Sequence, residues 1–184
     1  MGSEALTKLI TYDDYRELPD DGKQYQIIGG ELYMAPAPRI YHQRILLNLA
    51  KIVDTFTDKN NLGDVLIAPV DVVLSMTDVV QPDLIFVSKK RLNIVTKNNI
   101  VAAPDLVVEI LSEHSETIDR TKKKDLYERH GVKEYWIVDP ENKKIEQFIL
   151  TDQKFAEQPI VHSDKKLSSS VLKGLNLNLD KVFD

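Results

Sequence analysis

The sequence predicts an α/β fold of the α+β kind, in which helices flank a mixed β-sheet. Residues 39–59 repeat apolar residues at helical spacing, and a second helix is expected over residues 116–130, between a capping serine and a glycine stop. Several short runs are rich in β-branched and aromatic residues, as strands are. Hairpin, helix, several strands, helix, strand and hairpin follow one another, and this order favours a mixed sheet with helices packed on it.

Length and composition indicate one domain. The chain has 184 residues, 42% of them hydrophobic, and no low-complexity block divides it, so we expect a single domain over residues 1–184. No apolar run approaches the roughly 20 residues that span a bilayer. The N-terminal "MGSEALTKLITYDDY" lacks the basic-then-apolar layout of a secretion signal. These features predict a cytoplasmic protein without a membrane partner.

Cysteine count and charge narrow the chemistry. The chain has no cysteine, which excludes disulfides, thiolate catalysis and cysteine-ligated zinc. Any metal would need oxygen or imidazole ligands, which favours Mg²⁺ or Mn²⁺. A net charge of -5 argues against non-specific coating of nucleic acid. Local basic strips remain open, although such clusters are usually just solvated; they lie at residues 89–91, 120–124, 143–144 and 165–166.

The first elements are a hairpin and a long helix. "YQIIGGELYM", residues 25–34, predicts a hairpin because Gly29-Gly30 suits a tight turn. Residues 39–59 predict a helix that ends at "NNLG". Residues 64–75, "DVLIAPVDVVLS", are expected to form a strand with a break or edge position at Pro69.

The later elements alternate strand and helix. "PDLIFVS" and "PDLVVEILS" predict two apolar strands. The second helix is expected between an N-cap at Ser115 and a stop at Gly131. "EYWIVDP" predicts a buried strand, with Tyr135 and Trp136 in the core, that turns into "KIEQFIL". The tail "SSSVLKGLNLNLDKVF" is expected to close the structure as an edge strand or a packed arm.

Three carboxylates on the two "PD" strands suggest a metal site. Asp105 and Glu109 share a strand face but lie roughly 13 Å apart along it, too far to share one Mg²⁺. Asp105 is therefore expected only to start its strand. Asp83 is the better partner for Glu109 because neighbouring strands are about 4.8 Å apart. In the alternative, Asp83 merely marks a strand start and Glu109 is an exposed position on a one-sided strand.

Several stretches of the sequence resemble a known family. "QPDLIFVS", "PDLVVEILS" and "DRTKKKDLYERHGVKEYWIVDP" are similar to the bacterial putative restriction endonucleases of the PD-(D/E)XK nuclease superfamily, formerly a domain of unknown function. The similarity extends to "YQIIGGELYM", "HQRI" and "LKGLNLNL", almost the whole chain. It implies a restriction-endonuclease-like fold and Mg²⁺-dependent DNA cleavage, with Asp83 and Glu109 holding the metal. Many relatives of this fold act as dimers, which implies a homodimer.

The chain departs from the superfamily motif at Leu111, where a lysine is usual. The resemblance implies that the cation comes from the next helix instead. There Asp119, Lys123 and Tyr127 are spaced by four and share one face, which makes Lys123 the first replacement, ahead of Lys124 and Lys122. The alternative is an ordinary surface pair between Asp119 and Lys123.

Other family positions match only in part. Glu31 and His42 match, and could contribute to the site or be structural. Gln26 and Gly29 stand where relatives have acids. With Leu111, they leave open a second function, a catalytically weak or inactive module that binds nucleic acid or protein. The sequence does not predict the recognition site or the choice between DNA and RNA.

Overall fold

The computed structural model describes residues 8–19 and 21–184 of the chain. Residues 1–7, part of the stretch that lacks the layout of a secretion signal, lie outside the described residues. Within the described ranges, no helix has both the length and the apolar character needed to cross a bilayer.

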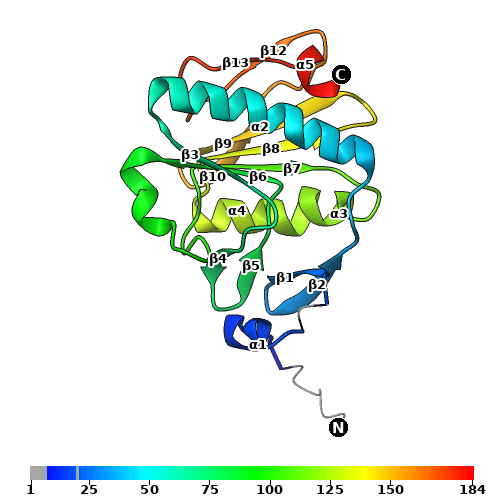
Figure 1. Cartoon of the computed structure of the whole chain (residues 1–184), viewed down its shortest axis with the longest axis vertical. Coiled ribbons are helices and arrows are strands. Elements are labelled where there is room, and N and C mark those ends of the chain that lie inside the picture. The colour runs from blue at the N-terminus through cyan, green and yellow to red at the C-terminus, as the bar shows by residue number, and fades with distance from the viewer. Residues whose placement is uncertain (1–7, 20) are drawn as a thin grey trace.

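A mixed sheet of seven strands forms the centre of the molecule (Figure 1). Only β7 (Leu106–Ile110) and β8 (Glu134–Asp139) are parallel neighbours. The other neighbouring strands are antiparallel, as a mixed sheet requires. From β8 the order continues outward to β9 (Lys144–Thr151) and then β10 (Lys154–Glu157), with β11 (Val161–His162) also paired to β9, and from β7 outward to β6 (Leu84–Ser88) and β3 (Gly63–Ile67).

Helices cover both faces of this sheet (Figure 1). On one face lies α2 (Ile40–Asn60), where the sequence predicts a helix. On the other lie α3 (Glu116–Ile118), the π-helical η2 (Asp119–Lys123) and α4 (Lys124–His130) in one run. The predicted stop at Gly131 is confirmed, and its φ of 81° suits glycine. Ser115 stands at the predicted N-cap position, although its hydroxyl accepts a hydrogen bond from Ser112 rather than capping the helix.

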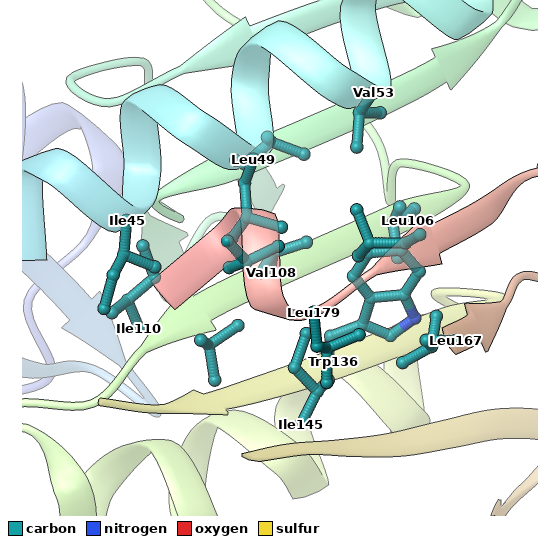
Figure 2. Close-up of a cluster of buried hydrophobic side chains, with 14 of the residues drawn as sticks. Ile45, Leu49, Val53, Leu106, Val108, Ile110, Trp136, Ile145, Leu167 and Leu179 are labelled. Carbon is teal, nitrogen blue, oxygen red and sulfur yellow. The ribbon is translucent and has the colours of Figure 1, made fainter. Parts of the chain in front are cut away.

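The core has two layers because the central strands are buried on both faces. Figure 2 shows Ile45, Leu49 and Val53 of α2 packed over Leu106, Val108 and Ile110 of β7. Trp136 belongs to this layer and Tyr135 to the opposite one, both fully buried as predicted. Because every residue of β7 is buried, a polar side chain on that strand needs a partner.

A second sheet of four strands lies beside the first. Its order is β2 (Glu31–Ala35), β1 (Gln24–Ile28), β5 (Asp78–Val80) and β4 (Val72–Ser75), and β1 with β2 is the predicted hairpin. The predicted break at Pro69 is confirmed, since β3 ends at Ile67 and β4 begins at Val72, and the two strands belong to different sheets. Proline cannot donate to a strand ladder, and the chain changes sheets around Pro69. Helix α1 (Tyr12–Arg16) lies beside this second sheet, whereas the 3-10 segment η1 (Lys89–Ile94) follows β6 and contacts β3 and β6 of the first.

The C-terminal segment is a packed arm, and the edge-strand alternative is wrong. Strands β12 (Lys166–Ser168) and β13 (Asn176–Asn178) pair only with each other, and α5 (Asp180–Phe183) follows them. The arm lies over α2 (Figure 1) and adds Leu167, Leu177 and Val182 to the core. Fully buried Glu134 anchors it by accepting hydrogen bonds from the backbone N–H groups of Ser170 (2.7 Å) and Val171 (3.1 Å).

Candidate active site

Two acidic side chains stand opposite each other across β6 and β7. Leu84 pairs with Val108 in the antiparallel register, which continued by one residue sets Asp83 opposite Glu109, and both side chains line one cavity. Cross-strand neighbours share one face of a sheet, with Cβ atoms about 5 Å apart. The expected strand pairing is confirmed, and it brings these two carboxylates together.

Asp105 lies in a separate, structural environment. Its carboxylate accepts a hydrogen bond from the backbone N–H of Ser88 (2.8 Å) and lies 2.5 Å from Lys133 Nζ. A guanidinium nitrogen of Arg91 is 3.1 Å away. These contacts tie the start of β7 to the end of β6, in agreement with the role expected for Asp105.

The helix after β7 adds a buried lysine and a buried tyrosine to Glu109. Lys123 Nζ is 3.0 Å from Glu109 Oε1, and the Tyr127 hydroxyl donates a 2.6 Å hydrogen bond to the same oxygen. Lys123 Nζ is also 3.0 Å from Asp119 Oδ1. Each of these four residues is at most 5% exposed. The alternatives of a surface Asp119–Lys123 pair and an exposed Glu109 are therefore wrong.

The lysine comes from the π-helical turn η2. Asp119 and Lys123 are its first and last residues, and Tyr127 follows in α4. The sequence predicts a shared face for the three side chains, and the structure places them on one, although the wide turn was not foreseen. Such turns inside α-helices often occur at functional sites.

The charges in this cluster do not balance. Burial raises the pKa of Glu109 to about 8; Lys123 opposes that rise, while the carboxylates of Asp119 and Asp83 add to it. Burial opposes the charge of Lys123 as well, but Asp119 and Glu109 together hold its pKa above the usual value. Three carboxylates thus lie near a single lysine, and either a proton on Glu109 or a further cation would relieve their mutual repulsion.

His42, near the start of α2, contacts Asp83. Its Nε2 atom is 3.3 Å from Asp83 Oδ2 and 3.1 Å from the carbonyl oxygen of Ile110. Burial lowers the pKa of His42, but Asp83 and the Ile110 carbonyl outweigh this effect and raise it overall. Asp83 Oδ2 also accepts a hydrogen bond from the Ile110 backbone N–H at 2.7 Å.

Two other predicted site residues lie elsewhere. Glu31 is exposed on β2 and pairs with Lys122 Nζ at 2.7 Å. Lys124 Nζ lies 4.1 Å from the centre of the Phe148 ring. The structure therefore brings Asp83, Glu109, Asp119, Lys123, Tyr127 and His42 together, and leaves Glu31 and Lys124 outside that group.

A cavity of about 130 Å³ opens beside the cluster. Asp83, Glu109, Asp119 and Lys123 line one part of it. Another part carries Gln26 and Gln81. Gln81 is not among the site residues that the sequence predicts. The available signal was its place two residues before Asp83, on the same face of an extended segment.

The residues fit an open magnesium site better than a closed one. Among the described residues, no group of three or more His, Asp or Glu side chains could enclose a metal ion. Mg²⁺ commonly takes one or two protein carboxylates and completes its octahedron with water and substrate oxygens. Asp83 and Glu109, on adjacent strands and in excess negative charge, supply that kind of donor set.

Comparison with known proteins gives the family. A family model described as "Uma2: Putative restriction endonuclease" matches residues 12–180. The chain belongs to the Uma2 family. No curated protein matches it significantly. A solved structure described as a putative nuclease belonging to DUF820 from Anabaena variabilis ATCC 29413 is 19% identical, with a TM-score of 0.79. The match covers 95% of this chain and 97% of that one, so the Uma2 chain has the fold of that protein.

Proposed function

We propose that this Uma2 protein is a Mg²⁺-dependent DNA endonuclease, acting as one domain over residues 1–184, with Mn²⁺ as an alternative metal. Asp83 and Glu109 would hold the metal, and Lys123 would supply the cation that the strand lacks at Leu111. One observation carries the proposal: Lys123 Nζ makes a buried contact of 3.0 Å with Glu109 Oε1. Asp83, next to β6, faces Glu109 across the two adjacent strands. Family membership supports the same chemistry.

Each side chain has a definite task in this proposal. The chemistry that Mg²⁺ supplies when bound is polarisation of the scissile phosphoryl group. Lys123 places positive charge where negative charge grows on the phosphate oxygens in the transition state. Tyr127 holds Glu109 in one orientation through its hydroxyl. His42 would orient Asp83, since its Nε2 atom lies 3.3 Å from Asp83 Oδ2.

Substrate binding does not rest on a continuous basic strip. Arg120 pairs with Glu146 at 2.6 Å, and Lys144 pairs with the same carboxylate at 3.0 Å. Arg91 contacts Asp105, and Lys122 contacts Glu31. Much of the basic charge is thus neutralised within the protein. DNA contacts are therefore expected near the cavity, and a homodimer would place two such sites on the two strands.

The test is nicking of supercoiled plasmid by purified protein with Mg²⁺, with Mn²⁺ and with chelator. Activity should require metal and be lost in Asp83→Ala and Glu109→Ala, while Asp105→Asn retains it at a temperature where that variant is folded. Calorimetric titration with Mn²⁺ should show binding to the wild type and not to Asp83→Ala. Unchanged nicking in both alanine variants would refute the proposal.

Two observations favour a second candidate, a binding module without catalysis. Leu111 is buried in the core and cannot act as a cation, and Gln26 is neutral and only 8% exposed beside the cavity. Retained DNA binding without Mn²⁺ binding or nicking would support this candidate. A hydrolase of small phosphodiesters would instead cleave such substrates without DNA, although the sequence has no glycine-rich phosphate loop.

A further inference from the structure

Gln81 lines the active-site cavity and carries a fixed, unsatisfied acceptor. Its Oε1 atom is buried and has no hydrogen-bond partner in residues 8–19 and 21–184. Its Nε2 atom donates to Asp71 Oδ1 at 2.8 Å and to the Tyr15 hydroxyl at 3.3 Å. A carboxylate only accepts, so turning the amide over would set two oxygens against each other. The direction of the carbonyl is therefore determined by the protein.

The partners of Gln81 come from two parts of the chain, Asp71 at a distance of 10 residues and Tyr15 at 66. The Tyr15 hydroxyl donates to Asp71 Oδ1 at 2.8 Å. Tyr15 lies on α1, whose start is capped by reciprocal hydrogen bonds between Thr11 and Asp14. This short helix, far from the metal-ligand candidates in sequence, thus holds the Gln81 amide in place. Such an arrangement is expected for a side chain whose orientation matters.

A second acceptor in the same cavity is also unsatisfied. Gln26 Oε1 is buried without a hydrogen-bond partner in the described part of the chain, and Gln26 is only 8% exposed. Leaving a buried acceptor unpaired costs about 1–3 kcal/mol. Gln26 and Gln81 both line the cavity that contains Asp83 and Glu109. Two unpaired acceptors in one cavity indicate a ligand or water that brings hydrogen-bond donors.

The bridging phosphate of DNA cannot satisfy these oxygens, because a phosphodiester anion carries acceptors only. Water carries two donors. We propose that Gln81 Oε1 accepts a hydrogen bond from the water that attacks the phosphorus, and so orients it; this rests on the proposed function. The water oxygen forms the new bond to phosphorus as one P–O ester bond breaks. The water releases one proton to solvent, and the leaving oxygen takes one up. Gln81 directs the water and takes no proton.

The test compares Gln81→Met with the wild type in steady-state cleavage of an oligonucleotide duplex, with Mg²⁺ at saturation. Loss of the directing contact should lower kcat about 100-fold and leave KM and the Mn²⁺ affinity from calorimetry within about 3-fold. Gln81→Asn keeps the amide but withdraws the carbonyl by one methylene group. It should lower kcat similarly, and it replaces Gln81→Met should that variant fail to fold.

The outcomes separate this inference from the function on which it rests. An inactive wild type would refute the endonuclease and the role of Gln81 together. An active wild type with unchanged kcat in both Gln81 variants would refute only the role of Gln81. A rise in KM or an altered sequence preference at unchanged kcat would also refute it, and would assign Gln81 to an amino group of a base. A kcat loss that tracks a lowered melting temperature would mean that the network is structural.

Discussion

The two Pro-Asp pairs offer a matched experiment, because Asp83→Asn and Asp105→Asn make the same change at the same local motif. Asp105 is 1% exposed and contacts the Ser88 N–H, Lys133 and Arg91. Asp83 contacts the Ile110 N–H and His42, and Glu109 stands opposite it. One carboxylate is surrounded by positive charge, and the other adds to an excess of negative charge. The two substitutions should therefore act on different properties.

The magnitudes follow from these contacts. Asparagine at Asp105 keeps an oxygen for the Ser88 N–H but loses two ion pairs. Hydrogen bonds to charged groups contribute about 1.5–3 kcal/mol each, and solvent reduces this because the Lys133 side chain is 53% exposed. A loss of about 2 kcal/mol lowers the melting temperature by roughly 4–8 °C in a chain of this size. Asp83→Asn removes a repulsion with Glu109 but also loses the pair with His42, and because these effects oppose each other its effect on unfolding should stay within about 1 kcal/mol.

Activity should show the opposite pattern. Loss of a metal-binding carboxylate should cost several kcal/mol in the transition state, or at least about a 100-fold drop in nicking rate. Circular dichroism gives the melting temperatures, and plasmid nicking below both melting temperatures gives the rates. If Asp105→Asn abolished nicking at unchanged stability while Asp83→Asn stayed active, the metal would belong to Asp105 and the strand-geometry argument would be refuted.

The pH dependence of stability provides a third measurement on the Asp105→Asn variant. Burial opposes the charge on Asp105, but Lys133, the Ser88 N–H and Arg91 outweigh it and lower its pKa. A lowered pKa in the folded protein means that the stabilisation is complete above the unfolded pKa near 3.8 and is lost as pH falls through the folded value. The difference in unfolding free energy between wild type and Asp105→Asn should thus be full at pH 7 and shrink below about pH 4. A difference independent of pH would contradict this account.

The other predictions concern the lysine and the C-terminal arm. Lys123→Met leaves Glu109 and Asp119 without their cation and should lower the free energy of unfolding by about 3–5 kcal/mol, measured with urea. Adding Leu111→Lys to Lys123→Met returns a lysine to the strand and should raise nicking at least about 10-fold over the single variant; no gain in a folded double variant would contradict the displaced-lysine hypothesis. Glu134→Ala leaves buried donors unpaired and should cost about 3 kcal/mol and expose residues 163–174 to limited proteolysis; protection equal to wild type would contradict its anchoring role.

The sequence predicted those features that depend on local periodicity. Alternation along β7 assigned its faces, and a spacing of four put Asp119, Lys123 and Tyr127 on one helix face. The family resemblance then directed Lys123 toward Glu109, where the structure places it. These patterns hold in the folded protein because the sheet is buried on both faces. Any other register would expose the apolar side chains of the strands, which costs free energy. The separation of β3 from β4 could not be found in this way, because both are apolar runs and only their distant partners differ.

The part of the site that escaped prediction depends on long-range contacts. The Tyr15 hydroxyl bonds Asp71, which lies 56 residues away, and His42 bonds the carbonyl of Ile110 across 68 residues. No local pattern marks such pairs, since each residue type is common and its partner is set by the assembled fold. The π-helical turn at η2 is similar, because its five residues read as ordinary α-helix in sequence.

Moving the lysine from strand to helix changes what the site depends on. A lysine at position 111 would be fixed by the sheet itself, whereas Lys123 reaches Glu109 only while η2 is docked against β7. Leu126 and Tyr127 pack this helical run into the core, and two ion pairs add to the docking: Lys122 bonds Glu31 at 2.7 Å, and Arg39, before α2, bonds Glu113 at 2.8 Å. Both pairs are exposed and therefore weak at physiological salt. Under the proposed function, salt should thus reduce nicking through helix docking as well as through DNA binding, and single-turnover rates at saturating protein would separate the two effects.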